Sequence, residues 1–178
     1  GSADTWISVF HKTNNFGGIA DIKDKDGWYN MLVRFPVFQS EGGPVPDGAT
    51  IESATLSLYK TSSYDHVYTA TRILKAWQET AVSWNNRLPG TAWSVAGAAG
   101  IGTDIATAPD GQGSVGFAPQ QWLNIDVTSG IQAMSTGAAN HGWLIDGLSG
   151  YNNIRHFNSR EVANAGLRPK LSIRYSVN

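Results

Sequence analysis

Hydrophobic residues alternate with polar ones over short segments of the chain, which predicts β-strands. The clearest segment spans residues 51–61, where Leu56 and Leu58 share one predicted face and polar residues lie between them. Further strands are predicted at residues 5–10, 31–35, 67–77, 121–127, 142–147, 154–161 and 170–177. Because helices do not alternate with these strands, the pattern favours an all-β fold, an antiparallel β-sandwich, over a parallel sheet.

One short helix is predicted over residues 126–134, where polar capping residues precede Ile131 and Met134. These two apolar side chains would close one end of the core. Residues 89–120 are rich in glycine, alanine and proline with little periodicity, which predicts a long surface loop or irregular strands. No internal repeat is visible, so we expect one domain over residues 3–178, with residues 1–2 as the remnant of a cleaved tag.

Length and charge narrow the classes of partner. The chain has 178 residues, of which 41% are hydrophobic, enough for one substantial core. Its 13 basic and 14 acidic residues are spread along the chain and leave a net charge of −1, which disfavours binding to nucleic acid or to an anionic membrane. No apolar run approaches the roughly 20 residues that cross a bilayer. We therefore expect neither a nucleic-acid nor a membrane partner.

The composition favours an extracellular β-protein. The absence of cysteine excludes thiol nucleophiles, cysteine-ligated metal sites and disulfide scaffolds. Only 15% of the residues are charged, against about 25% in average proteins, and the chain has 20 glycines and seven tryptophans. We expect a secreted or cell-surface domain that is a monomer.

The sequence contains no recognisable catalytic motif. Its four histidines are scattered, and there is no zinc-protease helix motif, nucleophile elbow, phosphate-binding loop or dinucleotide fingerprint. Two of the 14 acidic residues could pair for glycoside hydrolysis, but their number alone does not distinguish such an enzyme from other proteins. The sequence therefore predicts a protein that is not an enzyme.

Aromatic and basic residues are the best candidates for a binding site, because the apolar face of a sugar stacks on flat rings and guanidinium groups bind uronate carboxylates. Trp77, Trp84 and Trp143 lie among apolar neighbours and are predicted in the core. The candidate stacking residues are Trp6, Trp28, Tyr68, Trp93, Trp122 and Tyr151. The candidate cationic residues, which could form one groove, are Arg34, Arg72, Arg155 and Arg174. The alternative for these arginines is a solvated outer face with cross-strand ion pairs.

A metal site is a further hypothesis. Asp24, Asp26 and Gly27 form the first half of a calcium-binding loop, but the third acidic position and the closing glutamate of an EF-hand are missing. We therefore expect at most one structural calcium ion, with Asp24 and Asp26 as candidate ligands, and no other cofactor.

A series of motifs in order along the chain resembles the DNRLRE domain family. They are Asp4-Thr5-Trp6-Ile7, Asn15-Phe16-Gly17, Leu32-Val33-Arg34-Phe35, residues 49–59, Trp77-Gln78-Glu79, Val82-Ser83-Trp84-Asn85-Asn86, Asp126-Val127-Thr128, Gly142-Trp143-Leu144-Ile145, residues 157–161 and Arg168-Pro169-Lys170-Leu171. The resemblance implies a secreted β-sandwich of jelly-roll type, an accessory module beside polysaccharide lyases, glycoside hydrolases or surface proteins. Some relatives are carbohydrate-binding modules, with alginate among their ligands. In this resemblance Arg160 and Glu161 belong to the most persistent motif, and we expect them to form a structural pair.

Three functions are compatible with these observations. The first is a non-catalytic carbohydrate-binding module that targets a covalently linked catalytic domain or a surface protein to a polysaccharide, an acidic one such as alginate included. The second is a structural or adhesive spacer domain of a cell-surface protein. The third is a small polysaccharide lyase or hydrolase, which would need a tyrosine, a histidine and an arginine, or two carboxylates, in one cleft. Exposed rings and cations gathered in one place would favour the first.

Overall fold

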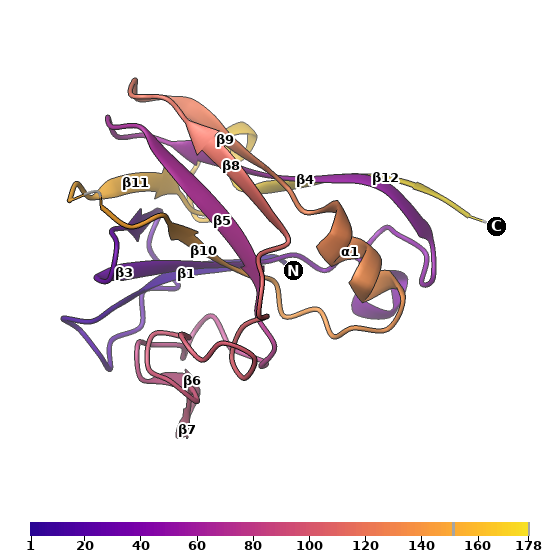
Figure 1. The fold of residues 1–178 in the computed structure, drawn as a ribbon, viewed down its shortest axis with the longest axis horizontal. Coiled ribbons are helices and arrows are strands. Elements are labelled where there is room, and N and C mark those ends of the chain that lie inside the picture. Colours follow the sequence, from indigo (N-terminus) through magenta and orange to yellow (C-terminus); the bar gives the residue numbers. More distant parts are fainter. Residues whose placement is uncertain (151, 178) are drawn as a thin grey trace.

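The computed structural model describes residues 1–150 and 152–177 and shows two antiparallel β-sheets packed face to face (Figure 1). The strands of the first sheet follow the order β1 (Ala3–Ser8), β3 (Tyr29–Arg34), β10 (Trp143–Gly147), β5 (His66–Arg72) and β8 (Gly111–Val115). Those of the second follow the order β12 (Lys170–Ser176), β4 (Thr50–Lys60), β11 (Arg155–Asn158) and β2 (Asp21–Asp24), and β9 (Gln121–Asp126) also pairs with β4. The predicted all-β sandwich is confirmed.

The smaller elements are one α-helix, two 3₁₀ turns and a hairpin. They are α1 (Thr128–Ser135), η1 (Gln39–Glu41), η2 (Ala165–Leu167), and the paired strands β6 (Asn86–Leu88) and β7 (Thr91–Ala92). No helix in the described part of the chain is long and apolar enough to span a membrane.

Strand β4 organises the second sheet because both of its edges are paired. Residues 55–60 pair with β9 along one edge. Thr55 also pairs with Ser172 of β12, and Lys60 also pairs with Phe157 of β11. Strands β12 and β11 therefore occupy successive parts of the other edge of β4. This order places β9 and β2 at opposite edges of the second sheet.

The main core lies between the two sheets. Alternation along β4 and β9 directs Leu56, Leu58, Leu123 and Ile125 into it, and each of these side chains is fully buried. Burial of a side chain of this size contributes about 1.5–3 kcal/mol. Helix α1 closes one end of the core, as predicted, and buries Ile131 and Met134.

A second hydrophobic cluster covers the outer face of the first sheet. On this face lie Ile7 of β1, Leu32 of β3 and Leu144 of β10. Their partners come from the segment between β5 and β8, which passes below β1 and β3 in Figure 1, and include Ile73, Trp77, Val82, Trp93 and Ala98. The prediction that residues 5–10 form a half-buried strand is therefore wrong for β1, which is buried on both faces. Part of the predicted surface loop over residues 89–120 is this covering layer.

A buried lysine connects two loops at one end of the sandwich. Lys60 is fully buried, and its ammonium group donates hydrogen bonds to the backbone oxygens of Tyr64 and Gly116. Burial lowers the pKa of this ammonium group, and the charge of Arg155 lowers it further. The two bonds hold the β4–β5 loop beside the β8–β9 loop.

Candidate functional site

Two exposed aromatic rings lie together where β1 ends and where β2 turns into β3. Trp28 is 40% exposed and Phe10 is 56% exposed, and their rings meet edge to face with centroids 4.8 Å apart. The turn that presents Trp28 is closed by its backbone N–H, which donates to the oxygen of Lys25 at 2.9 Å. Gly27 takes the left-handed conformation, with φ of 67°, that this turn requires. The backbone N–H of Val9 donates to the oxygen of Trp28 and so fixes the two segments side by side.

A layer of rings supports this pair from the interior. Trp6 stacks on Phe16 with centroids 3.9 Å apart and meets Tyr29 edge to face at 5.1 Å. Tyr29 in turn lies 6.4 Å from Trp28 and 6.3 Å from Phe10. Because the supporting rings are packed, the two exposed rings need little reorganisation to receive a flat ligand.

Lysine side chains add positive charge to the same place. The ammonium group of Lys25 lies 3.0 Å from the ring centroid of Trp28, and that of Lys23 lies 4.9 Å from the ring of Trp6. Lys25 is buried against the indole of Trp28, and Trp28 keeps 40% of its surface exposed. We call Phe10, Lys23, Lys25 and Trp28 the Trp28 surface. It can stack on the apolar face of a sugar and attract a carboxylate at once.

The other predicted stacking residues have different positions. Trp6, Tyr68 and Trp93 are 5%, 0% and 4% exposed, so the structure does not present them to a ligand. Trp6 and Tyr68 pack between the sheets, and Trp93 packs in the second cluster, where its indole N–H donates to the oxygen of Ser83. Trp122 is half-buried on the outer face of the second sheet. The prediction for Tyr151 lies outside the described residues.

The four predicted arginines do not form one groove, because the strand order separates them. Arg34 and Arg72 belong to the first sheet, whereas Arg155 and Arg174 belong to the second. Arg72 forms an ion pair with Asp110 at 2.9 Å, and Arg174 forms one with Glu52 at 3.3 Å. The exposed pair of Arg174 with Glu52 matches the alternative of solvated cross-strand ion pairs, whereas the pair of Arg72 with Asp110 is largely buried. Arg155 is fully buried and donates to the backbone oxygens of Asn153 and Asp65.

A histidine, a tyrosine and an arginine do meet, but inside the sandwich. His66, Tyr68 and Arg155 are at most 2% exposed and surround the buried carboxyl group of Asp24. Burial lowers the pKa of His66 to about 4, and burial together with the charge of Asp146 raises the pKa of Asp24 to about 7. A polymer chain has no access to these groups, so this set does not support the lyase alternative.

The residues predicted to bind calcium, Asp24 and Asp26, differ in burial. Asp24 faces the interior of the sandwich, whereas Asp26 lies in the β2–β3 turn and accepts a hydrogen bond from the backbone N–H of Gly150. Within the described residues, the carboxylate group that could hold a metal comprises Asp4, Glu79 and Glu161 instead. Asp24 and Asp26 both interact electrostatically with Asp146, and a calcium ion at Asp24 and Asp26 stays a prediction.

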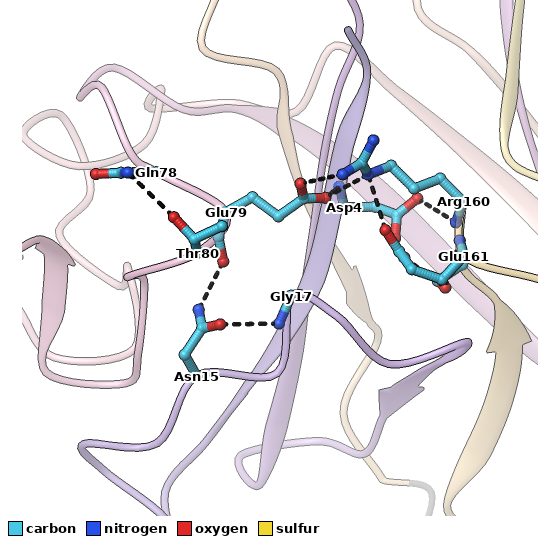
Figure 2. Close-up of polar contacts among 9 residues, drawn as sticks. Asp4, Asn15, Gly17, Gln78, Glu79, Thr80, Arg160 and Glu161 are labelled. Atoms are coloured by element: carbon cyan, nitrogen blue, oxygen red, sulfur yellow. Dashed lines mark hydrogen bonds and ion pairs between the residues drawn. The ribbon is translucent and has the colours of Figure 1, made fainter.

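The Asp4 cluster, which consists of Asp4, Glu79, Arg160 and Glu161, already contains a cation. Figure 2 shows the guanidinium group of Arg160 between the carboxylates of Glu79 and Glu161, at 2.7 Å and 2.9 Å. The backbone N–H of Arg160 donates to Asp4, and that of Asp4 donates to Glu79, both at 2.8 Å. The cluster joins β1, the covering segment and the chain after β11. The expected pair of Arg160 and Glu161 is thus part of a larger structural ion-pair network.

One carboxyl group of this cluster makes the stability of the fold depend on pH. Burial and the nearby charges of Glu161 and Glu79 raise the pKa of Asp4 from its ordinary value of 3.8 to about 7. Between these values the folded state keeps a proton that the unfolded state has released, so this group makes the free energy of unfolding fall as pH rises, until about pH 7.

Asp4→Asn should therefore reduce this decline. We expect the difference in unfolding free energy, variant minus wild type, to increase from about pH 5 to about pH 8 in urea titrations. Taking this difference cancels the contributions of Asp24 and Asp146, whose pKa values are also raised. A difference that stays constant with pH would contradict the assignment.

Comparison with known proteins gives one match. No curated protein is significantly similar to the chain. The family model of carbohydrate-binding module family 96 matches residues 1–175. This match confirms the expected kind of family, a carbohydrate-binding module, while the DNRLRE name itself stays a prediction. Since the match covers nearly all of the sequence, the chain belongs to carbohydrate-binding module family 96.

Proposed function

We propose that this domain is a non-catalytic module that binds an acidic polysaccharide, such as alginate, on the Trp28 surface. The observation that carries the proposal is the pair of exposed rings, Trp28 and Phe10, with the ammonium group of Lys25 against the indole. Membership of carbohydrate-binding module family 96 supports the general class of ligand. The choice of an acidic polymer is supported by the lysines.

The chemistry of a uronic acid matches both parts of this surface. The C–H face of the pyranose ring would stack on the exposed part of Trp28, and the carboxylate would lie toward Lys25 or Lys23. In the described part of the chain, no carboxylate lies within 4.0 Å of the Lys25 ammonium group, and that of Lys23 is 4.0 Å from Asp21. We expect an affinity of about 10–1000 μM for a short oligosaccharide, which corresponds to roughly −4 to −7 kcal/mol.

The benefit of such weak binding is targeting. In this proposal the domain is secreted or displayed at the cell surface and holds a linked enzyme or surface protein on a polysaccharide, which raises its effective concentration there. The burial of His66, Tyr68 and Arg155, where a polymer has no access, supports a binding role over a catalytic one at that group.

A charge-removal experiment tests the acidic specificity. Lys25→Gln should weaken binding to alginate about three- to tenfold in isothermal titration calorimetry, because the carboxylate loses a nearby ammonium group. Added salt should weaken binding by the wild type more than by the variant. Lys75→Gln, at an exposed lysine outside this surface, is the matched control.

The same titration with a neutral polysaccharide completes the test. The proposal requires weaker binding to the neutral polymer and no effect of Lys25→Gln on it. Equal affinity for both polymers, without salt dependence, would contradict the acidic specificity. Failure of every tested glycan to bind would favour the spacer function instead.

A further inference from the structure

A tryptophan with a lysine ammonium group over its ring occurs a second time, on the outer face of the second sheet. The ammonium group of Lys170 lies 3.9 Å from the ring centroid of Trp122. Trp122 pairs across the strands with Tyr59, and their rings meet at 5.1 Å and 67°. These residues come from the neighbouring strands β12, β9 and β4. We call Tyr59, Trp122 and Lys170 the Trp122 surface.

The surroundings of the Trp122 surface are polar, and the same strands carry two acidic side chains. Strand alternation places Thr55, Asn124 and Ser172 on the same face, where their hydroxyl and amide groups can bond to sugar hydroxyls. Glu52 forms an ion pair with Arg174, whereas Asp126 stays a carboxylate, because two hydrogen bonds from Thr128 lower its pKa.

Lys170 is available to an anionic ligand. It is exposed, and within the described residues no carboxylate lies within 4.0 Å of its ammonium group. A lysine side chain is flexible, so a ligand carboxylate can draw the ammonium group aside and free the indole face for a sugar ring. The charge of this surface therefore complements an acidic polysaccharide.

Two further exposed rings lie on loops at one end of the sandwich. Tyr64, in the loop after β4, and Phe117, in the loop before β9, are 39% and 63% exposed. Their rings meet edge to face at 5.6 Å, on the two loops that the buried Lys60 holds together. In Figure 1 these two loops project at the same end of the molecule, beyond β5 and β8.

We propose that the Trp122 surface is a second binding site, which takes another segment of the same acidic polysaccharide. This inference rests on the proposed function for the class of ligand, but its residues are different. Trp28 follows β2, whereas Trp122 lies on β9. Because β2 and β9 lie at opposite edges of the second sheet, the two surfaces are separate sites. A domain with two sites binds a long chain with avidity or cross-links two chains.

The test uses a short alginate oligosaccharide, because a short ligand occupies each surface separately. Wild type, Trp28→Ala, Trp122→Ala and the double variant are titrated by calorimetry, with circular dichroism to confirm folding. We expect two equivalents of ligand for the wild type, one for each single variant and none for the double variant. Lys170→Gln, an exposed change that spares the ring packing, should weaken binding at the second site about three- to tenfold, and Leu74→Ala is the control for loss of an exposed apolar side chain.

Long alginate provides a second readout. Only the wild type should cross-link the polymer, seen as an increase in light scattering that each single variant loses. One equivalent for the wild type, abolished by Trp28→Ala and unaffected by Trp122→Ala and Lys170→Gln, would overturn this inference and leave the proposed function intact. Binding abolished by Trp122→Ala and unaffected by Trp28→Ala would support the second site and overturn the placement of the first.

Discussion

Trp28→Ala is expected to weaken binding at the Trp28 surface about ten- to thirtyfold. Removal of the indole takes away the flat face on which the sugar stacks, and truncation of a central aromatic residue typically costs about 2 kcal/mol in a binding site. The variant also removes the ring that Lys25 covers, so the ammonium group loses its fixed position. Calorimetry with an alginate oligosaccharide, performed on a background of Trp122→Ala, isolates this site.

Two further variants test whether the loss of affinity is due to the flat ring of Trp28. Trp28→Phe keeps a flat ring and should lose less affinity than Trp28→Ala. Ile101→Ala removes an apolar side chain that is 71% exposed elsewhere and should leave binding unchanged. If Trp28→Ala bound as tightly as the wild type, the Trp28 surface would not be the binding site.

Arg160→Met should lower the free energy of unfolding by about 3 kcal/mol at neutral pH. The variant keeps most of the side-chain volume but removes the cation among three carboxyl groups, of which Asp4 is 2% exposed. Loss of one partner from a buried ion pair costs about 3–5 kcal/mol, and partial exposure of Arg160 places the expected value at the lower end. Urea unfolding monitored by tryptophan fluorescence measures the change.

Arg174→Met is the matched control, because the Arg174 side chain is 82% exposed and its pair with Glu52 is solvated. This substitution should change the free energy of unfolding by no more than about 0.5 kcal/mol. An equal, small effect of both substitutions would show that the Asp4 cluster does not hold the three segments together.

Strands with strict alternation could be predicted from the sequence, and strands without a side-chain signal could not. The segment at residues 51–61 corresponds to β4, and that at residues 121–127 to β9. Strand β8 escaped prediction because Gly111 and Gly113 provide no hydrophobic pattern. Both glycines lie close to β9, where a Cβ atom on either would collide with a backbone oxygen.

The local sequence pattern also does not show whether the second face of a strand is buried. Alternation places Trp6 and Ile7 on opposite faces of β1, but the segment that covers Ile7 lies about 70 residues further along the chain. Because this contact joins segments far apart in the sequence, Trp93 was predicted to be exposed, whereas it is buried in the second cluster.

The candidate site could be predicted in part. The turn that follows Asp24 indicated that Trp28 is exposed, and the structure adds Phe10 and Lys25 beside it. The sequence positions of both residues could have indicated their place in the site, because Phe10 ends a predicted strand and Lys25 lies within the turn before Trp28. The predicted arginine groove depended on the order of the strands in the sheets, which hydrophobic alternation along the sequence does not reveal. The observed order places the four arginines in two different sheets.

An NMR titration with a short uronate oligosaccharide would show directly whether a sugar stacks on the exposed indole. In ¹⁵N-labelled protein, the indole N–H signal of Trp28 should move progressively with added ligand. That of Trp143, whose side chain is fully enclosed and bonded to Asp110, should stay in place. A Trp28 signal that remains stationary at saturating ligand would contradict this account.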